Sequence, residues 1–271
     1  DEAIKMIQNK FGSFPYKEIP EFKVSEEKPI TSPVVKEVLG PDAAALFMGY
    51  RFEGAESKDA DILQLLGSVL FNEKAGLIDL NLNQQQKVLT GYAGANILKD
   101  YSYLFLYGKP REGQSLDEVK DLLISQIDLL KQGKFSDDLI PSIITDLKLQ
   151  EIKGYESNRN RAFAFVNSFI LGEEWDKSFN TVNRISKITK QDVVDFANKH
   201  LNNNYVAVFK KTGEDKNIVK VVKPQITPVQ VNRDAESDFV KNLIATPSPD
   251  VKPVFIDFKK DIQELQLQNK V

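Results

Sequence analysis

Short hydrophobic stretches that are bounded by turn residues and rich in aromatic and β-branched side chains predict β-strands in this chain. We expect such strands at residues 33–39, 44–52, 87–98, 101–108 and 205–211. The last stretch alternates hydrophobic and polar positions. Gly40 and Pro41 separate the first two stretches, and Lys99 and Asp100 separate the next two. Because both connections are short, the sequence predicts two β-hairpins.

A second pattern repeats hydrophobic residues every three or four positions, which predicts helices with one apolar face. In the helix expected after the N-cap residue Ser57, this face consists of Ile62, Leu65, Leu66, Val69 and Leu70. Two capping boxes predict further helix starts, one made by Ser115 with Glu118 and one by Thr189 with Asp192. Other helical stretches are expected at residues 1–11, 76–83, 136–157, 158–172 and 175–188.

The order of these elements predicts the fold class and the division of the chain. Strands that are joined as hairpins form an antiparallel sheet, and the helices must then cover one of its faces. We therefore expect an α+β fold, a two-layer sandwich with a mostly antiparallel sheet and helices packed on one face. Residues 1–19 are expected to end a preceding domain, residues 20–213 to form the domain itself, and residues 214–271 to be a linker and the lead-in to the next domain. Because its first residues are charged and helical in pattern, the chain is expected to be a mature or excised piece without a signal peptide.

Composition excludes several classes of function. The formal net charge is −3, so no basic surface for nucleic acid or anionic membranes is expected. No hydrophobic run approaches the roughly 18 residues that a membrane-spanning helix needs, and we expect no such span. The chain has no cysteine, which removes disulfides and thiolate metal sites.

Candidate catalytic chemistry is scarce. Helical zinc motifs of the H-E-x-x-H or H-x-x-E-H type need two histidines, and His200 is the only one here. His200 shares a helix face with Phe196 and Ala197 in the last helical turn, so we interpret it as a half-buried structural residue. No nucleophile motif or phosphate loop is present either. We therefore predict no catalytic residue and no metal ligand in this chain.

Four segments in a fixed order nevertheless resemble a known family. They begin with "ADILQLLGSVLFNEKAGLI" and "KVLTGYAGANIL", continue with "YSYLFLYGKPREGQSLDEVKDLLISQIDLL", and end with "ISKITKQDVVDFANKHLNNNYVAVFKKTG". Together they resemble the second-type domain of the insulinase/pitrilysin family of zinc peptidases, over about residues 20–213. The resemblance implies two halves of two α+β domains each, which close around an unfolded peptide. It also implies that the first domain carries H-x-x-E-H and the zinc, whereas the second domain carries no zinc ligand.

The resemblance implies partners, a cofactor and a compartment for the whole enzyme. The partners are a catalytic zinc-binding domain, in the same polypeptide or in a partner chain, and an extended peptide substrate. Zinc belongs to the full-length enzyme and no cofactor to this chain. The compartment implied is the bacterial periplasm or cell envelope, which the sequence itself leaves unknown. Our leading hypothesis is a noncatalytic domain that supports the zinc domain and walls the substrate chamber. The alternative is a scaffold or binding subunit of an inactive homologue.

One substrate-binding position can be carried over from the family pattern. Catalytic members often have an Arg followed seven residues later by a Tyr in the last of their four domains. Here Tyr92 occupies the tyrosine position and Gln85 replaces the arginine. The missing arginine argues against a substrate-polarising role and favours the second domain over the fourth. Tyr92 is the candidate substrate-binding residue that the family pattern implies. The competing interpretation is an ordinary aromatic strand residue.

Overall fold

The computed structural model describes residues 1–271 except 21, 23, 217–220, 230, 249 and 264–271. The chain divides into two units, residues 1–218 and 219–271, which are described separately below. Parts of the expected linker and lead-in therefore lie outside the described residues. The predicted domain limits at residues 19 and 213 remain a prediction.

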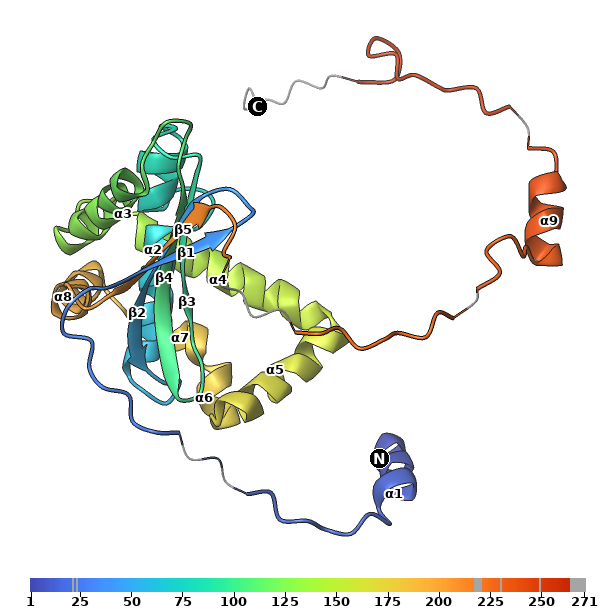
Figure 1. Ribbon diagram of the computed structural model, residues 1–271, viewed down its shortest axis with the longest axis horizontal. Coiled ribbons are helices and arrows are strands. Elements are labelled where there is room, and N and C mark those ends of the chain that lie inside the picture. The colour runs from blue at the N-terminus through green and yellow to red at the C-terminus, as the bar shows by residue number, and fades with distance from the viewer. Residues whose placement is uncertain (21, 23, 217–220, 230, 249, 264–271) are drawn as a thin grey trace. The chain divides into compact units, whose positions relative to one another are not determined.

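The first unit contains one five-stranded sheet with the strand order β1-β5-β2-β4-β3 (Figure 1). The strands are β1 (Val34–Gly40), β2 (Ala45–Glu53), β3 (Thr90–Asn96), β4 (Tyr101–Lys109) and β5 (Val206–Thr212). All neighbouring pairs are antiparallel except β1 and β5, which run parallel. The α+β class, with a mostly antiparallel sheet, is thereby confirmed.

The predicted hairpin between the first two strands is wrong. β5 lies between β1 and β2, so that Val208 pairs with Lys36 on one side and with Phe47 on the other. The connection between β1 and β2 packs against β5. Lys210 Nζ and Thr212 Oγ1, both on β5, donate to the carbonyl of Asp42 in this connection. The predicted hairpin of β3 and β4 is confirmed.

Three helices pack on one face of the sheet, and they are α2 (Asp59–Leu70), α3 (Leu116–Lys131) and α8 (Lys190–His200). The helices α4 (Leu139–Glu156) and α7 (Thr181–Ile185) pack against α2. The helices α5 (Asn158–Leu171) and α6 (Trp175–Phe179) contact α4 and α7. A Cβ placed on Gly108 of β4 would lie 2.4 Å from the Val119 side chain of α3, and one placed on Gly67 of α2 would lie 2.9 Å from the backbone nitrogen of Ala95. The buried core between these layers includes Leu46, Met48, Leu63, Leu66, Leu104, Leu106 and Leu123.

Both capping boxes are present as predicted, at Ser115 and at Thr189. Other helix limits differ from the predictions. The helix expected from Ser57 begins at Asp59, whose backbone N–H donates to Ser57 Oγ over 3.1 Å. The helix expected at residues 175–188 is interrupted at Asn180, which divides it into α6 and α7. The stretch at residues 76–83 contains a π-helix, η1 (Asp79–Asn83).

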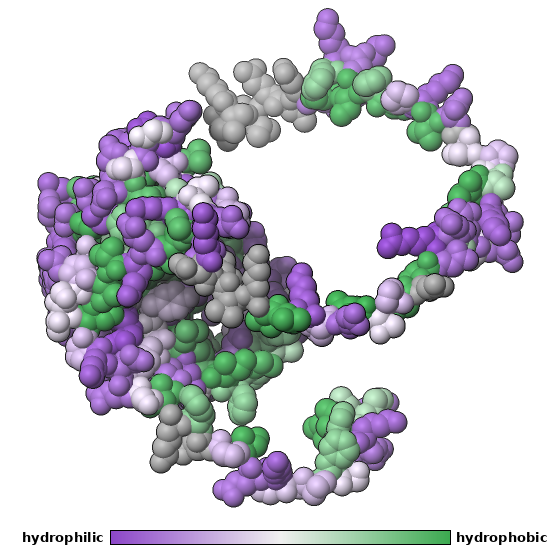
Figure 2. Space-filling view, viewed as in Figure 1, coloured by the Kyte–Doolittle hydropathy of each residue, from purple (hydrophilic) through white to green (hydrophobic). Residues whose placement is uncertain are grey.

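Two further helices contribute no buried residue. The expected helix at the start of the chain is α1 (Glu2–Phe11), which buries no residue and carries hydrophobic side chains on its surface (Figure 2). The second unit contains α9 (Asp238–Ala245), which the sequence interpretation as linker missed. Ser237 caps this helix by accepting a hydrogen bond from the Val240 N–H. Among the described residues, no helix is both long and apolar enough to cross a membrane.

Candidate functional site

The sheet face opposite the helices carries aromatic side chains, and we call it the open face. Side chains alternate across a strand, so the residues that flank the buried core positions point to this face. Its members are Phe47, Gly49 and Arg51 of β2, Tyr92 and Gly94 of β3, Tyr103, Phe105 and Tyr107 of β4, and Val206 and Val208 of β5. The strand register aligns them in rows, one of which runs from Val208 through Phe47 and Tyr107 to Tyr92.

Five rings of the open face form an unbroken series of contacts. The centroid distances are 4.8 Å from Phe47 to Tyr107, 4.5 Å from Tyr107 to Tyr92, 5.9 Å from Tyr92 to Phe105, and 6.3 Å from Phe105 to Tyr103. Phe47 is 47% exposed and Tyr103 is 40% exposed. Tyr92 and Phe105 are half-buried and Tyr107 is buried, so the exposed parts of this surface are at Phe47 and Tyr103. Exposed rings that are held in place by packed neighbours contact apolar groups at low entropic cost.

Tyr92, the predicted substrate-binding residue, lies within this series at the edge strand β3. Its ring also lies 6.2 Å from Phe71, which follows α2. Gln85, at the position of the family arginine, is exposed in the turn between η1 and β3. Sequence reasoning found Tyr92 but missed its row partners Phe47 and Tyr107. Side chains alternate between the two faces along β2 and β4, and this period of two was the signal that could have placed Phe47 and Tyr107 on the same face as Tyr92.

Two clefts adjoin at one end of the open face. The first has a volume of about 330 Å³ and is lined by Ile30, Gly49, Tyr50, Arg51, Tyr101, Ser102, Tyr103 and Val206. The second, of about 310 Å³, shares Ile30, Arg51 and Tyr101 with the first. It is also lined by three carboxylate side chains, which are those of Glu26, Glu27 and Glu53.

His200 occupies the environment that the sequence predicted, a half-buried position near the end of α8. Its ring packs 4.4 Å from Phe196 and 5.8 Å from Phe52, measured between centroids. Burial lowers the pKa of His200 below its usual value, whereas Asp59, 3.9 Å away, acts in the opposite direction. Its Nε2 is buried and has no hydrogen-bond partner among the described residues. Within the described part of the chain, no three His, Cys, Asp or Glu side chains gather in a way that could hold a metal ion. The residues that the structure describes therefore do not fit a catalytic zinc ion.

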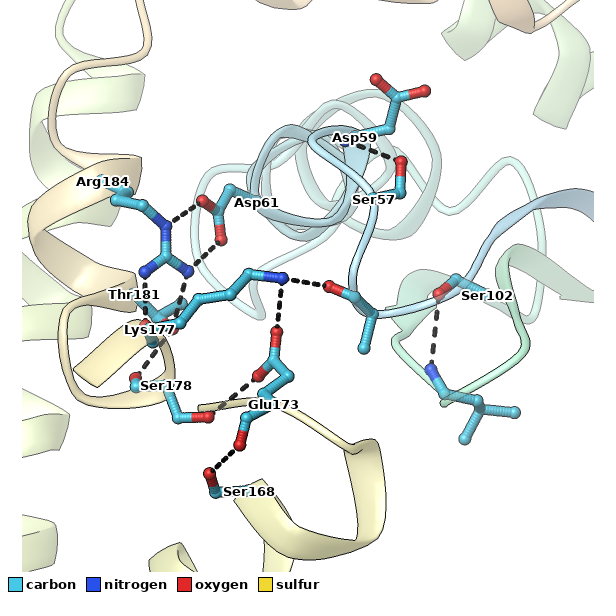
Figure 3. Close-up of polar contacts among 12 residues, drawn as sticks. Ser57, Asp59, Asp61, Ser102, Ser168, Glu173, Lys177, Ser178, Thr181 and Arg184 are labelled. Atoms are coloured by element: carbon cyan, nitrogen blue, oxygen red, sulfur yellow. Dashed lines mark hydrogen bonds and ion pairs between the residues drawn. The ribbon is translucent and has the colours of Figure 1, made fainter. Parts of the chain in front are cut away.

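A network of charged and polar side chains joins α2 to the α6–α7 region (Figure 3). Arg184 donates from Nε and Nη2 to the two carboxylate oxygens of Asp61, over 2.6 and 3.0 Å. Lys177 donates to the carbonyl of Ala55 over 2.8 Å and lies 3.0 Å from Glu173. Each of these charged side chains meets an opposite charge, so the network is built to hold the helices in place.

Comparison with known proteins identifies the family. A model of the "Peptidase M16 inactive domain" matches residues 1–147. The chain belongs to this family. The match confirms the resemblance to a noncatalytic domain of the insulinase-type zinc peptidases. No curated protein sequence matches the chain.

Solved structures share the fold of this M16 inactive domain. A protease from Helicobacter pylori has a TM-score of 0.71 and 16% identity, covering 78% of this chain and 52% of that one. The first half of the periplasmic protease PqqL from Escherichia coli has a TM-score of 0.58 and 16% identity, covering 78% and 48%. A peptidase M16 inactive domain from Pseudomonas fluorescens has a TM-score of 0.65 and 12% identity, covering 81% and 52%. The chain thus spans about half the length of these structures, and at such identities the likeness establishes the fold alone.

Proposed function

We propose that this chain is the noncatalytic second domain of a zinc-dependent metalloendopeptidase that cleaves peptides. Residues 20–213 support the zinc-binding domain and form one wall of the substrate chamber, and residues 214–271 lead to the second half of the enzyme. The catalytic zinc-binding domain lies in the same polypeptide or in a partner chain. Zinc belongs to that domain, and its chemistry there is the activation of water for peptide hydrolysis.

The observation that carries this proposal is the series of rings from Phe47 to Tyr103 on the open face. An unfolded peptide presents many different side chains, and a wall that must contact all of them gains from rigid, amphipathic rings. Tyr92 contributes its ring to this surface and is the substrate-contacting residue we propose. The strand edges of β1 and β3 provide a second mode of contact, since an extended peptide can add to a sheet edge through backbone hydrogen bonds.

The proposed compartment is the bacterial periplasm or cell envelope. Support comes from the similarity in fold to a protein described as the periplasmic protease PqqL. Fractionation of cells that express the full-length protein from its own gene tests this compartment. Recovery of the protein in the cytosol alone would overturn it.

The contact between peptide and open face can be tested by hydroxyl-radical footprinting of the chain with and without an excess of an unstructured peptide. Mass spectrometry then measures oxidation at each aromatic side chain. We expect protection at Phe47, Tyr92 and Tyr103, with no change at Phe169 of α5, which is 86% exposed and serves as an internal control. Protection at Phe169 without protection of the three open-face rings would contradict the proposal.

A further inference from the structure

The helix α5 carries an apolar stripe on its exposed side. This α5 stripe consists of Phe163, Val166, Phe169 and Ile170, whose spacing places them on one side of the helix. They are 45–86% exposed, and of the described residues of α5 only Ser168 is buried. The helix packs against α4 and α6 and lies farther from the sheet than α2 does (Figure 1). The first unit therefore leaves this side of α5 uncovered.

The α5 stripe has the size of the apolar centre of a stable protein interface. Aromatic side chains have roughly 150–250 Å² of surface, and Val and Ile have somewhat less, so the exposed fractions of the stripe and of the neighbouring Phe165 amount to roughly 500 Å². The largest apolar patch on a typical monomeric protein covers roughly 300–600 Å² and often has a function. A stable interface buries roughly 800 Å² on each partner, of which about two thirds is apolar in homodimers. The stripe with a polar rim matches one side of such an interface.

The charges at the two ends of α5 oppose its helix dipole. A helix dipole favours acidic residues near the N-terminus and basic residues near the C-terminus. In α5 the first turn has no acidic residue and the last turn has no basic residue. Instead, Arg159 and Arg161 lie near its N-terminus, and Glu173 and Glu174 follow its C-terminus. These charges are therefore unfavourable for α5 within a single chain.

Arg159 and Glu174 are open to pairing with another molecule. The Arg159 guanidinium carbon lies 5.5 Å from the centroid of the Phe163 ring, so this cation borders the α5 stripe. Glu174 is exposed at the start of α6. Among the described residues, neither of these two side chains forms an ion pair, whereas Glu173 lies 3.0 Å from Lys177.

The stripe and its flanking charges are symmetric about the peptide bond that follows Val166. Phe163 and Ile170 lie at equal sequence distances from this bond, and so do Arg159 and Glu174. A two-fold axis at this point sets two copies of α5 antiparallel and brings each residue next to its symmetry counterpart. Phe163 of one copy then meets Ile170 of the other, and Arg159 meets Glu174. Charges that are unfavourable in one chain become favourable in the pair.

We infer that the α5 stripe is the interface of a homodimer, in which α5 packs antiparallel against α5 of a second copy of this chain. The apolar residues form the centre of the interface, and Arg159 and Glu174 form reciprocal ion pairs at its rim. The order of the charges favours a second copy as the partner, because only self-pairing makes use of opposite charges at equal distances from one centre. The inference is independent of the proposed function, which concerns the open face of the sheet.

Sedimentation velocity of the whole chain over the micromolar concentration range measures this association. The unmodified chain is expected to form dimers. Phe169→Glu places a charge in the apolar centre of both copies and is expected to raise the dissociation constant about ten-fold or more. Phe22→Glu is the matched control, since Phe22 and Phe169 are both 86% exposed. Circular dichroism and thermal unfolding establish that both variants are folded.

The ion pairs are tested by charge reversal. Arg159→Glu and Glu174→Arg are each expected to weaken the dimer several-fold, because like charges then meet at both ends of the interface. A chain with both substitutions should regain the affinity, and an equimolar mixture of the two single variants should form a mixed dimer. Arg159→Glu also improves the charge at the N-terminus of α5, so its weaker dimer should be accompanied by an undiminished thermal stability of the monomer.

The antiparallel arrangement is tested with single cysteines, because the chain has none of its own. Val166→Cys lies next to the two-fold axis and is expected to form a disulfide with its counterpart under mild oxidation. Arg159→Cys lies roughly 20 Å from its own counterpart, at about 1.5 Å per helical residue, and should form none. Electrophoresis without reductant measures both. Equal cross-linking of the two variants would contradict the antiparallel pairing.

Other outcomes overturn the dimer. A chain that stays monomeric throughout the micromolar range, or a dimer that Phe169→Glu leaves intact, contradicts an interface at α5. If the chain is monomeric and Phe169→Glu instead loses affinity for the proposed zinc-binding domain, the stripe belongs to the contact with that domain. Footprinting of the open face with peptide is a separate result, so the failure of one proposal leaves the other standing.

Discussion

The ring of Tyr92 stacks on the ring of Tyr107, with their centroids 4.5 Å apart and their planes inclined by 28°. The two residues are directly opposite each other on β3 and β4. This pairing makes Tyr92 part of a surface that continues to Phe47 on β2. A tyrosine that the sequence marks only as an isolated candidate is thus one end of an aromatic row across three strands.

Replacement of Tyr92 by alanine is expected to weaken binding of unstructured peptides several-fold. The change removes a ring from the open face and leaves the fold in place, because Tyr92 is only half-buried at an edge strand. Tyr92→Phe should bind as the unmodified chain does, since the ring is retained. Fluorescence anisotropy provides the Kd values, and Tyr16→Ala, at a residue that is 92% exposed, is the control. Equal affinity of Tyr92→Ala and Tyr16→Ala would exclude Tyr92 from the contact surface.

Removal of the Asp61 carboxylate is expected to lower the free energy of unfolding by about 1–3 kcal/mol. The change leaves the Arg184 guanidinium without two charge-assisted hydrogen bonds at a partly buried site. Urea unfolding of Asp61→Ala measures this loss. The control is Asp146→Ala, which breaks the Lys74–Asp146 pair, where the side chains are 68% and 43% exposed. That exposed pair should contribute about 1 kcal/mol or less. A larger loss in Asp146→Ala than in Asp61→Ala would contradict this assignment.

Stability is expected to fall as the pH drops through about 6.5, in part because of His200. Burial lowers the pKa of His200 from its usual value of 6.5 in the folded chain, with Asp59 opposing and Lys199 reinforcing this shift. The unfolded chain therefore binds the proton more readily, and acidification favours unfolding. The carboxyl groups of Glu118 and Asp192 also have lowered pKa values in the folded chain, but they titrate in a more acidic range.

The variant His200→Phe tests this pH dependence. It keeps a ring against Phe196 and cannot be protonated, so its urea midpoint should change less between pH 7.5 and pH 5.5 than that of the unmodified chain. If both proteins lose the same stability over this interval, His200 is not a source of the pH dependence.

The isolated chain is expected to bind no stoichiometric zinc and to cleave no peptide. The physical reason is that the only imidazole, His200, packs between aromatic rings, and the carboxylate of Asp59 lies 3.9 Å away from it. Metal analysis after dialysis and incubation with quenched fluorescent peptides provide the two measurements. About one zinc per chain would refute this prediction. The same measurements on the full-length protein distinguish an active peptidase from an inactive homologue that acts as a scaffold.

Local signals were the most accurate guide to the fold. The capping boxes at Ser115 and Thr189 were predicted correctly because the residues that form each box lie within one helical turn. The β3–β4 hairpin was predicted for the same reason, since the connection is short. The helix α9 was missed because its proline-containing surroundings indicate a linker, although Ser237 provides an N-cap signal.

Distant contacts could not be predicted from the sequence. The residues after Gly40 have the composition of a turn, and nothing near them reports that a strand from residues 206–212 enters between β1 and β2. The same limit applies to the candidate site. Tyr92 could be selected by its position in a family pattern, whereas its contact with Tyr107 and the cleft above Gly49 depend on the register of three strands.

The parallel pairing of β1 with β5 also determines when the five-stranded sheet can form during synthesis. β1 pairs with no other strand in the described sheet. Val35 and its neighbours therefore cannot form their strand hydrogen bonds until β5 has been synthesised, near the end of the first unit. Until then the edge of β2 stays unpaired and able to join other chains. The newly made polypeptide is therefore most prone to aggregation just before β5 emerges, and a shortened form that ends before Val206 would keep this hazard permanently.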